Sequence, residues 1–321
     1  MLDILAITGP IYLLIALGFA ATQWGAFDKS DLKTLGKFVI QLALPALLFK
    51  ALSQNRWGDF FNWGYCLVYG MGSLATLVLG YVWIRKGQHQ SALVSTFSAM
   101  GMSCANSGFV GYPILLLVLA TVAPQALAMN MMVENLLILP LLLFMADTAV
   151  QGHASWKTLH QSFKNLFKNP MILAIAAGLL TASLSLQLPE VLTRSVNFLA
   201  LSCSALSLFV IGGSLAGLSF KGMGGKVGPI VLGKLILQPL MVWGVIKLVL
   251  WSGGISGFDA PLQTAVLLSA AMPMMGIYTT LAMKYHQEAM SAAAMLLATV
   301  ASFFTLSLLL WVCHDALPVL H

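Results

Sequence analysis

The chain has 321 residues, of which 59% are hydrophobic and 8% are charged, and its net charge is +6. Soluble domains carry charged residues at about a quarter of their positions, so this composition excludes an ordinary soluble enzyme. The lysines and arginines stand in short segments between apolar stretches. That distribution is typical of membrane-protein loops and argues against a nucleic-acid partner.

Windows of about twenty apolar residues recur along the chain, each long enough to cross a bilayer. The first lacks the basic segment of a cleavable signal peptide, and it continues into a full-length span. We expect ten spans, at 4–24, 34–54, 60–84, 91–120, 126–149, 169–187, 195–217, 228–251, 262–285 and 291–313. The sequence therefore predicts an all-α polytopic membrane protein, with the lipid bilayer as its surroundings.

The basic residues divide unequally between the two sets of loops. One set carries twelve of the 16: Lys29, Lys33, Lys37, Arg85, Lys86, Lys157, Lys164, Lys168, Lys221, Lys226, Lys234 and Lys284. The other set carries Lys50, Arg56, Arg194 and Lys247. Because the richer side faces the cytoplasm, both termini are expected on the periplasmic side of the inner (plasma) membrane.

The fourth span contains residues that a plain membrane helix does not need. Asn106, Ser107, Gly108 and Pro113 lie near its centre. Proline removes a backbone donor and glycine loosens the helix. Freed backbone groups are tolerated in a membrane only where they are buried in protein or line a polar cavity. The pattern predicts a helix broken near the midplane with Asn106 beside the break, as in a transporter binding site.

A second interrupted span, 262–285, contains Pro273, Met275 and Gly276. Three residue pairs share a spacing of 160: Pro10 with Pro170, Gly18 with Gly178, and Pro113 with Pro273. The spacing indicates a duplication. With five spans in each half, the second half enters the membrane from the opposite face. We expect an inverted repeat of 1–149 and 169–321, joined by a basic amphipathic cytoplasmic helix at 150–168.

The fifth span places Glu134 and Asn135 near the middle of the membrane, and no lysine or arginine is expected at that depth. An ionisable residue there normally faces the protein interior or a water-filled cavity. Two interpretations remain open. Glu134 is either a carboxyl group hydrogen-bonded to broken backbone or a proton or cation site.

Four segments, taken in order, resemble the auxin efflux carrier family. The run NSGFVGYP (106–113) resembles that family's first crossover helix, and AAMPMMGIYTTLAMKY (270–285) is similar to the second. LALPALLFKALS (42–53) and NPMILAIAAGLL (169–180) resemble its second and sixth spans. The family includes plant PIN exporters and bacterial carriers of malonate and malate. This chain has only the short 150–168 link where many plant PINs have a long hydrophilic loop.

The resemblance implies ten helices in two inverted five-helix repeats, with broken helices four and nine crossing in a core. It implies that helices one, two, six and seven form a scaffold, often with a homodimer interface. Asn106 and Pro113 match the first crossover and Pro273 the second, while Glu134 and Asn135 match the pocket-lining part of helix five. Met274 and Met275 depart from the polar residues of many relatives, which puts a second polar clamp, and a sodium site there, in doubt.

From these observations we expect a transporter of a small organic anion that moves its core against its scaffold, and no enzyme. Soluble-enzyme motifs, a membrane protease pair and a bound cofactor are not expected, and coupling to H⁺ or Na⁺ stays undetermined. The alternatives are a sodium-coupled carrier of the bile-acid symporter type and a passive channel or receptor. The expected substrate-binding residues are Asn106, Ser107, Gly108, Tyr112, Pro113, Glu134, Asn135, Pro273, Met275 and Gly276.

Overall fold

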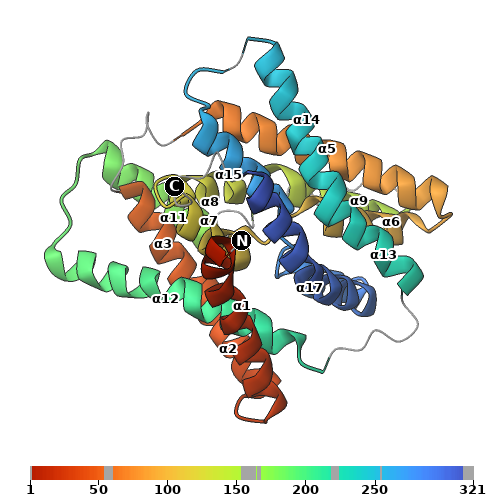
Figure 1. Cartoon of the computed structure of the whole chain (residues 1–321), viewed down its shortest axis with the longest axis horizontal. Helices are drawn as coiled ribbons and strands as arrows, with labels where there is room; N and C mark the ends of the chain where they lie inside the picture. The colour runs from red at the N-terminus through yellow and green to blue at the C-terminus, as the bar shows by residue number, and fades with distance from the viewer. Residues whose placement is uncertain are drawn as a thin grey trace.

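The computed structural model describes residues 2–53, 61–152, 164, 168–217, 224–253 and 255–313 (Figure 1). Within these ranges the chain is helical and no β-strand is present, apart from one isolated antiparallel bridge between Ala105 and Met274. The fold is therefore all-α, as the apolar windows predicted. Most of the expected amphipathic helix at 150–168 lies outside the described residues.

Among the described residues, six continuous helices are long and apolar enough to cross a membrane. They are Lys29–Ser53, Trp63–Gly87, Ala123–Gln151, Glu190–Leu215, Gly225–Trp251 and Glu288–Val312. Their parts are α2 (Lys29–Phe38), η1 (Val39–Ala43) and α3 (Leu44–Ser53); α5 (Trp63–Val82) and η2 (Trp83–Gly87); α8 (Ala123–Val133), η4 (Glu134–Ile138) and α9 (Leu139–Gln151); α12 (Glu190–Leu215); α13 (Gly224–Leu232), η5 (Gly233–Leu237) and α14 (Gln238–Trp251); and α17 (Glu288–Val312).

The remaining helices are shorter, or they belong to interrupted segments. These are α1 (Leu2–Gln23), α6 (Ala92–Ser103), η3 (Ser107–Gly111), α7 (Tyr112–Val118), α11 (Pro170–Ser183), α15 (Ala260–Ala271) and α16 (Tyr278–Met283). Each range expected to span the membrane thus coincides with a helix or with an interrupted helix.

Four of the five π-helical turns in the described ranges are followed by a proline at the second position after the turn. The pairs are η1 with Pro45, η3 with Pro113, η4 with Pro140 and η5 with Pro239. In an α-helix the proline ring would clash with the carbonyl group four residues earlier, and its missing N–H would leave that carbonyl without a donor. A wider preceding turn relieves the clash. Pro113 therefore lies inside a helix and does not break it.

The helices form two groups around a central set (Figure 1). One group contains α1, α2, α3, α11 and α12, and the other contains α5, α6, α9, α13, α14 and α17. Helices α7, α8 and α15 lie between them. Two separate clusters of buried apolar side chains form the core.

The first group depends on glycines where two helix backbones touch. A Cβ added at Gly212 of α12 would lie 1.8 Å from the carbonyl oxygen of Ile15 in α1. One added at Gly18 would lie 2.0 Å from the carbonyl oxygen of Phe209. Small residues allow this approach, which is the usual way membrane helices gain packing contact.

Candidate functional site

The two interrupted segments meet through their backbones. Helix α6 ends at Ser103 and α15 ends at Ala271, and each is followed by residues that are not helical. The Asn106 N–H donates to the Pro273 carbonyl oxygen at 2.8 Å, and the Met275 N–H donates to the Cys104 carbonyl oxygen at 3.3 Å. The interruption expected beside Asn106 is therefore present, and it contacts the second one directly.

The positions of the two prolines differ from the expectation. Pro273 lies in the second interruption, whereas Pro113 lies in the helix that follows the first one. The 160-residue spacing therefore does not pair equivalent positions here. Helices α6 and α15 instead begin and end 168 residues apart, at Ala92–Ser103 and Ala260–Ala271. The bridge between Ala105 and Met274 lies at the midpoint of the contact.

Glu134 accepts a hydrogen bond from a backbone N–H group in the first interruption. Its Oε1 accepts hydrogen bonds from the Ala105 N–H at 2.8 Å and from the Tyr69 hydroxyl at 2.6 Å. Glu134 lies in η4 and is fully buried. Of the two interpretations of Glu134, the contact with broken backbone is thus present, while Oε2 has no hydrogen-bond partner among the described residues.

The position of Lys234 differs from the one expected from the sequence. The sequence predicts Lys234 in a cytoplasmic loop, whereas its side chain is 0% exposed and belongs to the π-helical turn η5. Its ammonium donates to the Ala270 carbonyl oxygen at 2.8 Å and to the Gln238 side-chain oxygen. Gln238 in turn donates to the carbonyl oxygen of Ser103, two residues before Ala105, whose N–H donates to Glu134. The expectation of no basic residue at the depth of Glu134 is therefore wrong.

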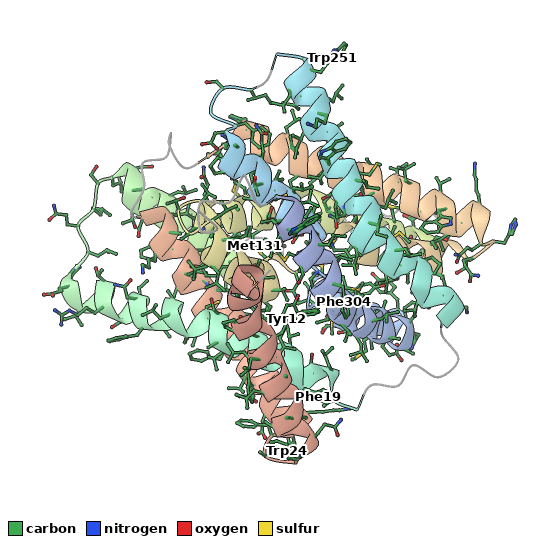
Figure 2. All side chains as sticks on the ribbon, in the orientation of Figure 1. Tyr12, Phe19, Trp24, Met131, Trp251 and Phe304 are labelled. Carbon is green, nitrogen blue, oxygen red and sulfur yellow. The ribbon has the colours of Figure 1, made fainter. Side chains whose placement is uncertain are left out.

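A cavity of about 970 Å³ opens beside the meeting point. Seven of the ten expected site residues line it: Asn106, Ser107, Gly108, Glu134, Asn135, Met275 and Gly276. Tyr112, Pro113 and Pro273 do not. Tyr112 packs in the apolar core, and Pro273 contributes its carbonyl group to the backbone contact. Met131, labelled in Figure 2, also lines the cavity near the centre of the molecule.

The cavity wall presents polar atoms without protein partners. The Asn106 side-chain oxygen accepts from the Phe109 N–H at 3.2 Å and so caps the helix that begins with η3. Its side-chain nitrogen makes no hydrogen bond to a described residue, and Asn106 is 5% exposed. The Ser107 hydroxyl is buried and also lacks a partner in the described part of the chain. Two donors at the start of a helix therefore remain available to a ligand.

Asn135 has a different environment. Its side-chain nitrogen donates to the Met131 carbonyl oxygen at 2.8 Å, and its oxygen accepts from the Asn169 side chain at 3.1 Å. Asn169 caps α11 by accepting from the Met171 N–H at 3.0 Å. Asn135 thus connects η4 to the beginning of α11, with both amides in the cavity wall.

Four lysines in the cavity wall were not assigned to the site from the sequence. They are Lys29, Lys33 and Lys37 of α2, together with Lys168. The signal was present, because a spacing of four residues places all three α2 lysines on one face of a helix.

An Asp28 capping box fixes the start of α2. The Asp28 carboxylate accepts from the N–H groups of Ser30 and Asp31, and the Asp31 carboxylate accepts from the Asp28 N–H. The side-chain hydrogen bond from Ser30 is the main reason that the pKa of Asp28 lies below its usual range. Asp28 and Asp31 do not line the cavity, so the charged side chains in its wall near α2 are lysines.

The described residues are helical, include six apolar helices of membrane length, and enclose a mostly apolar cavity with polar groups in its wall where two interrupted helices meet. These features define a polytopic protein of the transport class. The model of the membrane transport protein family matches residues 7–312, so the chain belongs to this family, the auxin efflux carrier family that its motifs resemble.

Two relatives cover most of the chain. A protein of Rhizobium meliloti (strain 1021) named "Putative malonate transporter" is 27% identical over 327 residues, which is 99% of this chain and 98% of the relative. The "Uncharacterized transporter YfdV" of Escherichia coli (strain K12) is 22% identical over 241 residues, 72% of this chain and 74% of its own length.

Proposed function

We propose that this protein is a secondary transporter of a small organic anion, with the substrate bound in the cavity at Asn106 and Ser107. The observation that carries the proposal is a pair of donors, the Asn106 side-chain nitrogen and the Ser107 hydroxyl, that have no partner among the described residues and lie at the N-terminal end of the helix Ser107–Val118. The partial positive charge of a helix N-terminus favours an anion. The name of the Rhizobium relative makes malonate the first substrate to test.

The charge distribution around the cavity supports an anionic substrate. Lys29, Lys33, Lys37 and Lys168 line one part of it, Asn106 lines another, and Glu134 is the one carboxylate among the described residues of the wall. An excess of one sign of charge in a cleft raises the local concentration of ions of the opposite sign. Met275 and Met131 add apolar wall, so the ligand combines a carboxylate with a small carbon skeleton.

The proposed architecture is an inverted repeat of two five-helix halves. Three contacts between helices have an equivalent contact under this repeat. The contact of α1 with α12 corresponds to that of α11 with α3. The contact of α5 with α6 corresponds to that of α14 with α15, and the contact of α6 with α9 corresponds to that of α15 with α17. The contact of α5 with α14 pairs equivalent helices directly. The matching ends of α6 and α15 support the same relationship.

The proposed orientation places the lysines of α2 on the cytoplasmic side and both termini in the periplasm of the inner membrane. Removing the buried Lys234 from the count leaves eleven basic residues against four, so the imbalance persists. Trp24 and Trp251 are 82% and 85% exposed and lie at opposite ends of the molecule (Figure 2). Exposed tryptophans at both ends fit the two membrane interfaces.

Transport would proceed by movement of the second helix group, together with the interrupted segments α6–η3–α7 and α15–α16, against the first group. The first group would act as the scaffold and as a homodimer interface. The cavity lies between parts of both groups, with α2, α3 and α12 on one side and η4, α16 and α17 on the other. Relative movement of these walls would expose the site to alternate sides of the membrane.

Uptake by proteoliposomes tests the function. We expect saturable counterflow of labelled malonate, which a passive channel does not produce. Asn106→Ala removes both the ligand donor and the cap on Phe109, whereas Asn106→Ser keeps an oxygen at the capping position. If Asn106 contacts the substrate, both variants lose about 1–3 kcal/mol of binding. Normal affinity in Asn106→Ser would limit Asn106 to its capping role.

A further inference from the structure

The buried lysine at the meeting point of the interrupted helices has no carboxylate partner in contact. Lys234 is fully buried, and among the described residues the one ion pair within 4 Å joins Arg194 to Glu190. The partners of the ammonium are neutral oxygens, the Ala270 carbonyl and the Gln238 side-chain oxygen. A buried cation is costly unless the surrounding structure supplies compensating negative charge.

The ends of two helices supply that compensation. Ala270 is the penultimate residue of α15, and Ser103 is the last residue of α6. The Gln238 side-chain nitrogen donates to the Ser103 carbonyl oxygen at 2.9 Å while its oxygen accepts from Lys234. Each helix C-terminus carries roughly half a negative charge, so the two together approach the single positive charge of the ammonium.

Glu134 completes the arrangement with the opposite sign. Its carboxylate accepts from the Ala105 N–H, just before the helix that begins at Ser107. Lys234 and Glu134 therefore face different ends of the interrupted helices, and they form no ion pair within 4 Å. Each buried charge therefore lies beside a helix end whose partial charge has the opposite sign.

We propose that the Lys234 ammonium occupies the position of an exchangeable cation between the C-terminal ends of α6 and α15, so that this carrier works without bound Na⁺. Carbonyl oxygens at the C-terminal ends of interrupted helices are the groups that coordinate Na⁺ in many secondary transporters. Here a covalently attached cation binds those oxygens. The consequence for transport depends on the proposed carrier function, whereas the consequence for stability does not.

Two substitutions separate the charge of Lys234 from its volume. Lys234→Met fills much of the same space without charge, and Lys234→Ala leaves the space empty with the Ala270 and Gln238 oxygens around it. Thermal unfolding of purified wild type and both variants is measured in chloride salts of sodium, lithium, ammonium and choline at equal ionic strength. Counterflow of malonate is measured in sodium and in choline.

We expect the melting temperature and counterflow of the wild type to be the same in sodium and in choline. Lys234→Met should have a lower melting temperature than the wild type in every salt and a transport rate at least about tenfold lower. The reason is that the C-terminal ends of α6 and α15 lose the positive charge that compensates their partial negative charges. Lys234→Ala should melt lower in choline and be stabilised, in a saturable way, by at least one of the small cations.

Three results would overturn the proposal. The first is a requirement of the wild type for sodium. The second is stability and transport in Lys234→Met equal to those of the wild type. The third is that no small cation stabilises Lys234→Ala, which includes the case in which this variant does not fold in any of the salts. If the wild type shows no counterflow of any organic anion, the transport proposal fails. The melting curves then still decide whether Lys234 acts as the internal cation.

Discussion

Replacing Glu134 by alanine and by glutamine distinguishes its backbone contact from its charge, because its two oxygens have different surroundings. Oε1 accepts from the Ala105 N–H and the Tyr69 hydroxyl, and Oε2 is buried without a partner in the described part of the chain. Alanine removes the acceptor of both buried donors. Glutamine keeps an oxygen for them and places its amide nitrogen at the position of Oε2.

The expected loss follows from these contacts. A buried donor left without an acceptor costs about 1–3 kcal/mol, so Glu134→Ala should lower the free energy of unfolding by about 2–6 kcal/mol. Glu134→Gln should stay within about 1 kcal/mol of the wild type, since both hydrogen bonds persist. Unfolding of the purified protein in detergent measures the difference. Equal stability of the two variants would refute the role of Oε1 as a backbone acceptor.

The charge of Glu134 is tested by transport. A carboxylate in the cavity wall repels an anionic substrate, and a bound proton removes that repulsion. If Glu134 couples a proton to the substrate, counterflow by the wild type should become faster as the pH falls, while Glu134→Gln should bind substrate and respond little to pH. An unchanged pH response in Glu134→Gln would show that Glu134 is not the coupling site.

Two further substitutions test the cavity wall and the helix packing. Lys37→Gln should raise the KM for malonate about two- to threefold at low salt. The increase should be smaller at high salt, because salt screens the long-range attraction between the lysine and the anion. Lys226→Gln is the control, since Lys226 is exposed outside the cavity, and its KM should change little. Gly212→Ala should lower the free energy of unfolding by about 1–3 kcal/mol or more, because the added Cβ would overlap the Ile15 carbonyl group. Gly244→Ala is the control: a Cβ added there has no neighbouring atom within 4 Å, so its effect on stability should be neutral or favourable. A KM change of equal size in Lys226→Gln, or an unaltered melting curve for Gly212→Ala, would contradict these assignments.

Several features of the fold and the site could be predicted from residues in one local stretch. Apolar windows predicted the all-helical membrane class, because a helix that crosses hydrocarbon needs a long apolar run whatever its neighbours are. The polar and glycine residues around Asn106 predicted an interruption, and that interruption is present. Ser107, Glu134 and Asn135 were expected in the site, and they line the cavity, while their binding of substrate stays a prediction.

Only the tertiary structure decided which distant residues contact the interrupted helices and the cavity. Local sequence could not separate a lysine near a loop from a buried one, because the Ala270 carbonyl that holds Lys234 is 36 residues away along the chain. Nor could it show that Pro113 remains helical, since the π-helical turn before it removes the clash that a regular α-helix would produce. The lysines of α2 join Asn106 in one cavity through packing between distant helices, and that packing depends on the whole chain.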